Sequence, residues 1–223
     1  MTASNTYERL VEQQHINFPS ITLPPEYAEL FEVNTLQVLI KLARYKFVAR
    51  ILKREDEVFE VGSGTGLGAI FLSQHAKSVI GLEIKKHDFE AAVAINRRAN
   101  VTFQHRSLYD FEPGNRQFDA VVSIDVIEHM PVEEGHRFVG ALAQHCRDNG
   151  LVVVGSPSIH SFPYQSKYSK AAHVKCYDQE ELIILMDKYF GRTLAFSMND
   201  EIVHTGHPKL AWYYFVIGFI PRR

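Results

Sequence analysis

A short stretch of nearly bare backbone limits what this 223-residue chain can fold into. The run "VFEVGSGTGLGAIFL", residues 58–72, starts as an apolar strand, continues through Gly62, Gly64 and Gly66, and ends in an apolar helical pattern. Glycine lets a loop turn tightly and lets a ligand lie against the main chain. The free N–H groups at the start of a helix attract negatively charged or oxygen-rich groups. This order of elements therefore predicts a cradle for a nucleotide-type cofactor.

Strands and helices alternate around this loop. Buried strand patterns are predicted at 57–61, 78–84, 101–105, 118–125 and 150–158, with a turn at 112–117. Helical periodicity is predicted at 26–52 (broken near Val33-Asn34), 67–75, 89–99 and 132–147. Alternation of this kind indicates a parallel sheet with helices on both faces. A further helix at 178–189, with a capping box formed by Asp178 and Glu181, precedes the last two strands.

The last two strand patterns, at 192–198 and 210–219, follow one another with only a loop between them. Such a pair predicts an antiparallel hairpin that closes the sheet. We therefore expect an α/β fold with a Rossmann-like seven-stranded sheet, mostly parallel, with one antiparallel strand from a C-terminal hairpin.

The composition is that of a soluble globular protein, with 46% hydrophobic residues, 22% charged residues and a net charge of −2. A nearly neutral chain gives no electrostatic reason to expect nucleic acid as a partner. Cys146 and Cys176 lie far apart and outside any metal-ligand spacing, which favours reduced thiols. There is no secretory signal pattern, and the apolar run 212–220 is too short to span a membrane. We predict one cytoplasmic domain, residues 1–223, without nucleic acid or membrane as a partner.

The glycine loop does not fit the dinucleotide pattern G-x-G-x-x-G, because Leu67 stands where the last glycine belongs. The observed G-x-G-x-G, preceded by Glu60, resembles the loop of class I S-adenosylmethionine-dependent methyltransferases. Four further features carry this resemblance, which covers about residues 36–220. They are Glu83, 17 residues beyond Gly66, and the segments "RSLYD", "FDAVVSIDVIEHMP" and "DNGLVVVGSPS". The "VIEH" segment is similar to that of small-molecule O-methyltransferases, including the ubiquinone-biosynthesis type.

The resemblance implies a set of residues around S-adenosylmethionine and its product S-adenosylhomocysteine. Glu60 is expected to hold the methionine ammonium, Arg44 the methionine carboxylate, and Glu83 both ribose hydroxyls. The other expected cofactor contacts are Gly62, Ser63, Gly64, Gly66, Ile84, Ser107, Leu108, Ile124 and Asp125. Many relatives have aspartate at the position of Ser107, so the adenine contact departs from the family pattern. Taken singly, Arg44 could be a surface residue of its helix and Glu83 a solvated strand end.

Two histidines are candidates for the general base. His129 follows the fourth strand by a few residues and so falls near the edge of the sheet where ligands bind. An imidazole acts as a base at neutral pH, although His129 could instead cap its loop and shape the pocket. His173, in "HVKCYDQEEL", resembles a family histidine that returns to the active site, with a structural hydrogen bond as the alternative. Glu128 could orient His129 or bind a metal, but the sequence offers no complete ligand set, so we predict no metal site.

The C-terminal part of the chain is expected to bind the acceptor. The segment after the fifth strand is rich in aromatic, serine and lysine residues, which suits a lid over a polar substrate. The polar loop "MNDEIVHTGHPK" resembles that of bacterial methyltransferases that act on sugars or polysaccharides. The predicted acceptor contacts are Tyr164, Asn199, Asp200 and His204. We expect residues 1–35 to form an arm or lid, 36–156 the cofactor half and 157–223 the acceptor half.

These features predict an S-adenosylmethionine-dependent methyltransferase that acts on a small polar acceptor. Oxygen of a sugar or of another hydroxylated metabolite is the expected target. A methyltransferase-fold binding module or partner subunit without catalysis is the alternative. A nicotinamide-dependent oxidoreductase is disfavoured by Leu67 and by the terminal hairpin. The chain is expected to act as a monomer or a homodimer.

Overall fold

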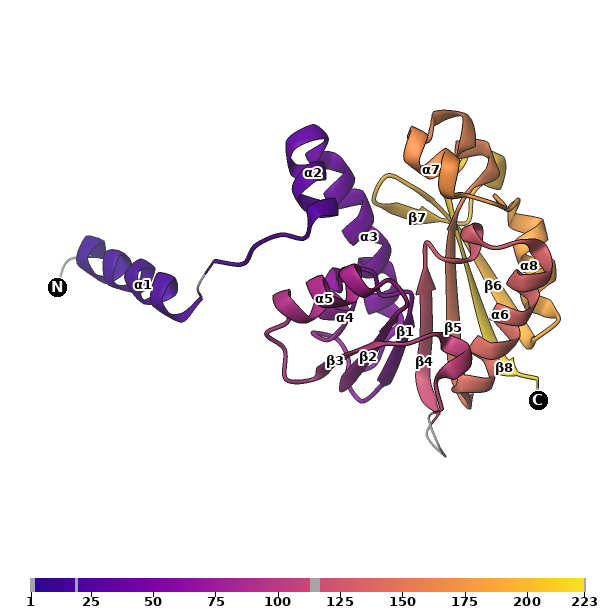
Figure 1. Ribbon diagram of the computed structural model, residues 1–223, viewed down its shortest axis with the longest axis horizontal. Coiled ribbons are helices and arrows are strands. Elements are labelled where there is room, and N and C mark those ends of the chain that lie inside the picture. Colours follow the sequence, from indigo (N-terminus) through magenta and orange to yellow (C-terminus); the bar gives the residue numbers. More distant parts are fainter. Residues whose placement is uncertain (1–2, 19, 113–116, 223) are drawn as a thin grey trace.

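The computed structural model describes residues 3–18, 20–112 and 117–222. Within them, one eight-stranded sheet of order β3-β2-β1-β4-β5-β8-β6-β7 lies between two layers of helices (Figure 1). The strands are β1 (Glu57–Val61), β2 (Ser78–Glu83), β3 (Val101–His105), β4 (Phe118–Ile124), β5 (Cys146–Pro157), β6 (Phe190–Asn199), β7 (Ile202–His204) and β8 (Tyr213–Pro221). The predicted α/β sheet with its C-terminal hairpin is confirmed. Most of the predicted turn at 112–117 lies outside the described residues.

The number of strands differs from the seven that were predicted. Strands β1 to β5 are parallel, and β8 is inserted antiparallel between β5 and β6. The additional strand, β7, forms inside the polar loop after β6. Asp200 has a φ of +49°, and this turn brings Val203 opposite Met198 in an antiparallel pair. The sheet therefore contains two reversed strands, where one was expected.

The described helices are α1 (Ala3–Asn17), α2 (Pro25–Val33), α3 (Thr35–Ile51), α4 (Leu67–Leu72), α5 (Lys86–Ile95), α6 (Val132–His145), α7 (Lys167–Ala172) and α8 (Gln179–Asp187). The predicted break near Val33-Asn34 and the capping box at the start of α8 are both confirmed. Helix α5 ends four residues earlier than expected. Asn96 accounts for this, because its side chain accepts a hydrogen bond from the Arg98 N–H (2.9 Å) and donates to the Val101 carbonyl (3.1 Å).

The two faces of the sheet carry separate hydrophobic cores. On one face, α3, α4 and α5 contribute buried side chains such as Val48, Leu72 and Ala92. On the other face, α6 and α8 contribute Leu142 and Met186, both without exposed surface. Truncating one such large side chain to alanine costs about 2–5 kcal/mol. The parallel strands are thus held from both sides, and their carboxyl ends form a fixed edge.

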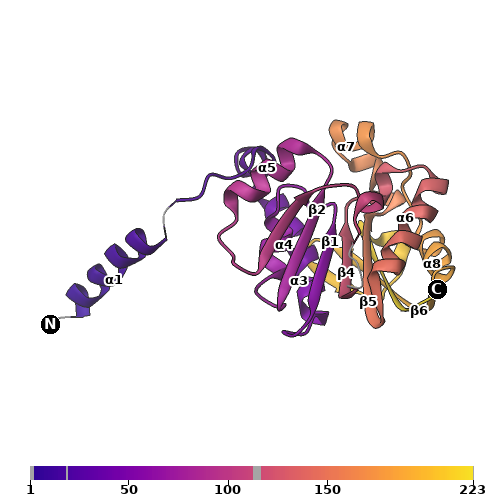
Figure 2. The same ribbon diagram turned by 60° about the horizontal axis from the view of Figure 1, so that its bottom comes forward.

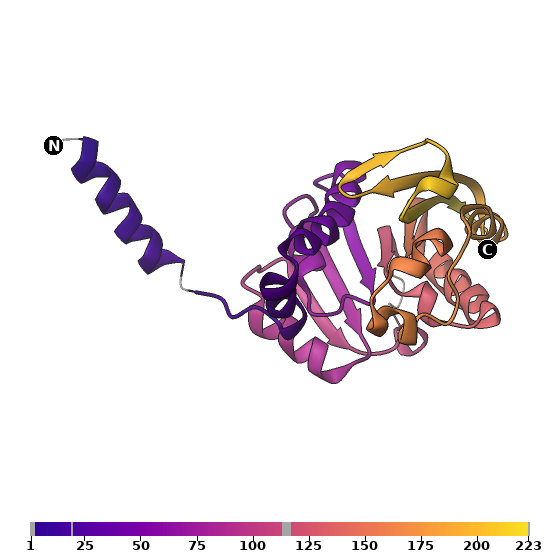
Figure 3. The same ribbon diagram turned by 90° about the horizontal axis from the view of Figure 1, so that it is seen from above.

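Three further elements surround that edge. Helix α2, the segment containing α7, and the β6–β7 hairpin lie around it when the molecule is seen from above (Figure 3). Helix α1 lies apart from the sheet, beyond α2 (Figures 1 and 2). Among the described residues, no helix is both long enough and apolar enough to cross a bilayer.

Candidate active site

The glycine loop joins β1 to α4 at the carboxyl edge of the sheet. Gly62, Gly64 and Gly66 have φ angles of +78°, +52° and +85°, a region that side chains other than glycine rarely adopt. A Cβ atom on Gly62 would lie 2.3 Å from Val126, and one on Gly66 would lie 2.6 Å from Ala92. A Cβ atom on Gly64 would meet nothing within 4 Å. Two of the glycines are therefore required by protein packing, whereas Gly64 leaves open space against the main chain.

Glu83 ends β2 and reaches the glycine loop directly. One carboxylate oxygen accepts a hydrogen bond from the Gly64 N–H and the other from the Lys85 N–H, each at 2.8 Å. A carboxylate oxygen has two lone pairs, so each oxygen still has one available for a hydroxyl donor. Next to it, Ile84 exposes 66% of its surface. A buried acid with free lone pairs beside an exposed apolar side chain suits a ribose and the base attached to it.

Glu60 is a fully buried carboxyl at the end of β1. Neither of its oxygens has a hydrogen-bond partner of normal geometry among the described residues. Burial raises the pKa of Glu60 to about 8, the nearby Tyr45 hydroxyl lowers it in part, and Glu83 raises it further. Ser63, in the loop that follows, also has a buried hydroxyl that finds no partner among the residues described. A buried, unpaired carboxyl is costly, and an ammonium group bound here would remove that cost.

Arg44 and Asp125 form a partly buried ion pair across the edge. Arg44 comes from α3, and Asp125 follows β4 with a φ of +58°. The Arg44 guanidinium also lies 4.1 Å from the centre of the Tyr213 ring. Among the described residues, Arg44 Nε and Asp125 Oδ1 are buried without a hydrogen-bond partner of normal geometry. The structure thus places Arg44 on Asp125, and its Nε–H can still donate to another acceptor.

The predicted adenine contacts lie after β3. The Ser107 hydroxyl accepts a hydrogen bond from the Tyr109 N–H at 3.2 Å and so caps a short 3₁₀ turn, Leu108–Asp110. The Leu108 side chain is only 5% exposed and belongs to the hydrophobic core. Ile124, at the end of β4, is similarly buried. Leu108 therefore contributes its side chain to the core and leaves mainly its backbone at the edge.

The two predicted catalytic histidines lie together. His129 ends the 3₁₀ turn Ile127–His129 after β4, and His173 follows α7. Their ring centres are 5.2 Å apart, and His129 Nδ1 lies 3.0 Å from the Ala172 carbonyl oxygen. Burial lowers the pKa of His173, and His129 lowers it further. The backbone carbonyl of Glu128 accepts hydrogen bonds from Val174 and Lys175, so the segment after α7 is fixed to the turn after β4.

Glu128 directly precedes His129 in the sequence, and its side chain is fully buried. Its Oε2 atom accepts a long hydrogen bond, 3.5 Å, from the Ser156 hydroxyl, and its Oε1 atom has no partner among the described residues. Burial and the nearby Asp125 raise the pKa of Glu128 well above its usual range. This edge therefore combines two imidazoles with a carboxyl that forms no direct ion pair within the described part of the chain.

Three of the four predicted acceptor residues are linked through Trp212: Tyr164 and Asn199 contact Trp212, and His204 contacts Asn199. The Tyr164 ring packs edge-on against Trp212 at 5.3 Å. The Asn199 side-chain oxygen accepts a hydrogen bond from the Trp212 N–H (3.1 Å), and its nitrogen lies 3.3 Å from His204 Nε2. Asp200 is exposed at the turn of the β6–β7 hairpin. Asn199 and His204 thus hold the hairpin together, while Tyr164 and Asp200 face solvent.

Three tyrosines at the edge, two of them buried and Tyr45 partly buried, were not among the predicted site residues. They are Tyr27 of α2, Tyr45 of α3 and Tyr213 of β8, and burial raises the pKa of each. Tyr45 lies against Glu60, and Tyr213 against Arg44 and Asp125. Tyr45 follows Arg44 directly, which is a weak signal in the sequence. No local pattern points to Tyr213, because only the insertion of β8 beside β5 brings it to this site.

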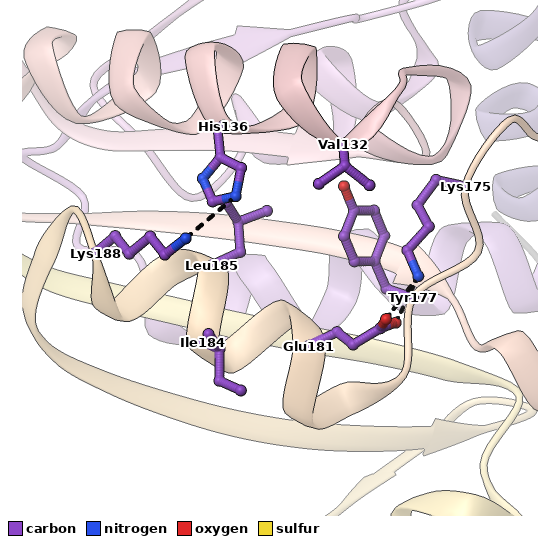
Figure 4. Close-up of a pocket in the computed structure, with 8 residues that line it drawn as sticks. All are labelled: Val132, His136, Lys175, Tyr177, Glu181, Ile184, Leu185 and Lys188. Atoms are coloured by element: carbon purple, nitrogen blue, oxygen red, sulfur yellow. Dashed lines mark hydrogen bonds and ion pairs between the residues drawn. The ribbon is translucent and has the colours of Figure 1, made fainter.

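A shallow pocket lies elsewhere, between α6 and α8 (Figure 4). Its lining residues are Val132, His136, Lys175, Tyr177, Glu181, Ile184, Leu185 and Lys188. Lys175 pairs with both Glu181 oxygens at 2.8 and 2.7 Å, and Lys188 lies 3.4 Å from the His136 ring. Its cations thus already have partners, and none of its lining residues belongs to the glycine loop.

Comparison with known proteins relates part of this chain to a protein family. The family described as "Methyltransferase domain" matches residues 58–150. A protein of Mycolicibacterium smegmatis, described as "Probable S-adenosylmethionine-dependent methyltransferase", is 27% identical over 150 residues, which is 66% of this chain and 54% of that protein. The mitochondrial ubiquinone biosynthesis O-methyltransferase of Dictyostelium discoideum is 30% identical over 113 residues, 44% of this chain and 34% of that protein. The chain spans about half or less of the length of these curated relatives.

A solved structure shares the fold over nearly its whole length. It is the Thermotoga maritima protein described as "SAM-dependent methyltransferase, possible histamine N-methyltransferase". It superposes with a TM-score of 0.68 at 20% identity, covering 87% of this chain and 94% of that chain. At this level of identity the match establishes the common architecture alone.

Proposed function

We propose that the chain, whose residues 58–150 match the methyltransferase domain family, is a class I S-adenosylmethionine-dependent methyltransferase that methylates an oxygen of a small polar acceptor. A sugar or another hydroxylated metabolite is the acceptor class we favour. One observation carries the proposal. Neither oxygen of the buried Glu60 carboxyl has a hydrogen-bond partner of normal geometry among the described residues, and Glu60 stands at the start of a glycine loop that is open at Gly64. An ammonium-bearing ligand laid along the main chain satisfies both features.

The residues around the loop fit S-adenosylmethionine part by part. Glu60 would bind the methionine ammonium, and the free lone pairs of Glu83 would accept from the ribose hydroxyls. The Arg44 Nε–H would donate to the methionine carboxylate while the guanidinium stays on Asp125. When bound, the cofactor supplies a methyl carbon on a positively charged sulfur, which an acceptor oxygen can attack. Alignment of the two reactants by such fixed groups supplies up to about 7–11 kcal/mol of the barrier reduction.

His129 and His173 would serve the acceptor side. A hydroxyl group must lose its proton as its oxygen bonds to the methyl carbon, and a positioned base typically accelerates such a step by about 10²–10⁴-fold. His173 is kept neutral by burial and by its neighbour, so its ring has a lone pair available near neutral pH. Oxygen is favoured as the target because the similar Dictyostelium discoideum protein is named as an O-methyltransferase.

The acceptor would lie between these histidines and the outer segments. We propose that Tyr164, Asn199, Asp200 and His204 line its far side, and that residues 1–35 form a lid or arm over the cofactor half. The β6–β7 hairpin and η3 (Ile159–Tyr164) both contact Trp212, so a displacement of one would also shift the other. We further propose that the protein works in the cytoplasm, as a monomer or a homodimer.

The proposal is tested by turnover. The purified chain is incubated with radiolabelled S-adenosylmethionine and panels of sugars, phenols and amines of matched size, and methylated product and S-adenosylhomocysteine are quantified together. The expected result is product from one hydroxylated class in equimolar amount with S-adenosylhomocysteine. Transfer only to amines would overturn the choice of oxygen. Tight cofactor binding with no transfer to any acceptor would instead support a binding module or a partner subunit.

A further inference from the structure

We propose that Glu128, His129 and His173 bind a divalent transition-metal ion. Each residue offers one ligand atom, and these atoms all lie within 4.8 Å of one another. Ligand atoms held about 2.1 Å from an ion are ~3–4 Å apart, so small side-chain rotations complete the site. The three residues come from two segments, the turn after β4 and the end of α7, which are tied together by the backbone hydrogen bonds to Glu128.

Glu128 is the anchor of this site. It is fully buried, and its Oε1 atom has no partner within the described part of the chain. The 3.5 Å contact with Ser156 satisfies Oε2 only weakly. A carboxylate in such surroundings is costly unless it is paired or coordinates a metal. A divalent ion at Oε1 provides the missing positive charge.

His129 is held in the tautomer that a metal needs. Its Nδ1 atom lies 3.0 Å from the Ala172 carbonyl oxygen, and a carbonyl oxygen only accepts hydrogen bonds. Nδ1 therefore carries the hydrogen, and Nε2 carries the lone pair. Donation of the second ring N–H to a backbone carbonyl is the usual outer-shell support of a metal-binding histidine.

His173 completes the set as a neutral imidazole. Its Nδ1 atom is buried and has no partner among the described residues. Two histidines whose ring centres are 5.2 Å apart repel each other when both are charged, whereas one ion between them binds both lone pairs.

The charges around the three ligands agree with a cation. Asp125 has a second carboxylate oxygen that is buried and has no hydrogen-bond partner of normal geometry among the described residues. Arg44 opposes a cation, but it is paired with the other Asp125 oxygen. Lys175 is engaged by Glu181. The two acids and two neutral rings thus outweigh the one arginine that faces them.

The ligand types select the metal. Two imidazole nitrogens and one carboxylate oxygen favour Zn²⁺, Mn²⁺, Fe²⁺ or Co²⁺ over the oxygen-seeking Mg²⁺ and Ca²⁺. Three protein ligands leave at least one position open for water or a hydroxyl group. If the proposed function holds, an acceptor hydroxyl bound to the ion would lose its proton more easily. The ion and the histidines would then share the task of deprotonation.

The test is direct metal binding by the metal-stripped full-length protein. Calorimetric titration with ZnCl₂ and MnCl₂ is expected to show one saturable site, and MgCl₂ to bind at least about tenfold more weakly. CoCl₂ should give a visible absorption band of protein-bound Co²⁺. Glu128→Gln and His173→Ala should each weaken binding by about 10–100-fold or more, since even outer-shell changes cost that much. His136→Ala, at a partly exposed histidine of α6 outside the proposed site, is the matched control and should bind like the wild type.

Two results would overturn the metal site: no saturable binding of any of these ions, or binding that survives both Glu128→Gln and His173→Ala. Thermal unfolding of each variant shows whether it is folded. The same samples are titrated with S-adenosylhomocysteine. Cofactor binding without metal binding removes the metal site and leaves the proposed function standing, whereas metal binding without cofactor binding does the reverse.

Discussion

The two halves of the carboxyl edge are built in opposite ways. On the cofactor side, the glycine loop follows β1 directly, and Glu83 reaches it by hydrogen bonds from the next strand. On the proposed acceptor side, the two histidines come from segments more than 40 residues apart, and the β6–β7 hairpin follows later still in the sequence. The difference teaches that a cofactor site can be encoded almost locally, whereas an acceptor site depends on how distant segments pack.

The largest effect is expected for substitutions in the glycine loop, on the proposed cofactor side. Gly66→Ala forces a side chain into a left-handed conformation and to within 2.6 Å of Ala92, so it should lower the free energy of unfolding by about 2–5 kcal/mol. Gly64→Ala has the same kind of strain but open space, so it should lower stability by only about 1–2 kcal/mol. It should nevertheless abolish binding of S-adenosylhomocysteine. Urea unfolding and calorimetry on both variants check this, and equal stability losses would contradict the distinction.

The next effect isolates the acceptor side. His129→Ala and His173→Ala should each lower kcat by about 10²–10⁴-fold if the pair supports deprotonation of the acceptor. Affinity for S-adenosylhomocysteine should stay within about threefold of the wild type, because neither ring contacts the glycine loop. Steady-state kinetics with the identified acceptor and calorimetry with S-adenosylhomocysteine measure the two quantities. A variant that lost cofactor affinity but kept kcat would show that the two halves are not separable in this way.

A third prediction concerns how the protonation of Glu60 affects cofactor binding. Because the pKa of Glu60 is raised to about 8, binding of an ammonium shifts this residue towards the carboxylate, so affinity for S-adenosylhomocysteine should rise with pH up to about 8. Binding below that pH should release a proton. Glu60→Gln should weaken binding about 10–100-fold, in keeping with the loss of a charge-assisted hydrogen bond, and should remove the pH dependence. Calorimetry in buffers of different ionisation enthalpy measures this, with the exposed Glu90→Gln as control.

The raised pKa of Glu60 should also affect the stability of the ligand-free protein. A carboxyl whose pKa is raised on folding destabilises the folded state as pH increases from about 4.5 to about 8, by up to about 1.4 kcal/mol per pH unit. Glu60→Gln should therefore flatten the decline of stability across that window. Chemical unfolding at a series of pH values tests it, and an unchanged slope in the variant would assign the decline to other groups.

The smallest effect concerns the hairpin. Asn199→Ala removes the acceptor of the Trp212 N–H and the contact with His204, and should cost about 1 kcal/mol of stability. Asp200→Ala removes an exposed side chain at the turn and should leave stability nearly unchanged. If the hairpin contacts the acceptor, both variants should raise KM for it by a few-fold. Unchanged KM and kcat in both would remove the hairpin from the acceptor site.

The same contrast decides how much the sequence alone could predict. The alternation of strands and helices, the break at Asn34 and the capping box at Asp178 are all local patterns, and the structure has them. The strand β7 was missed because three residues in a polar loop become a strand only by pairing with Met198 and its neighbours. The buried tyrosine Tyr213 was missed for a similar reason, since its place depends on where β8 enters the sheet.

The proposed metal site shows most clearly what the sequence alone could not predict. Glu128 and His129 are adjacent in the sequence, and their chemistry was visible there. The third proposed ligand, His173, was visible only as a separate candidate base, because its place beside His129 depends on the hydrogen bonds from the Val174 and Lys175 N–H groups to the Glu128 carbonyl. A complete ligand set could therefore be recognised only in the folded chain.

The most direct test of the central claim is calorimetric titration of the full-length protein with S-adenosylhomocysteine, with NAD as the parallel control. The account predicts saturable binding of S-adenosylhomocysteine and no binding of NAD, because Glu60 and the open position at Gly64 suit an ammonium-bearing ligand. Binding of NAD without binding of S-adenosylhomocysteine would contradict it.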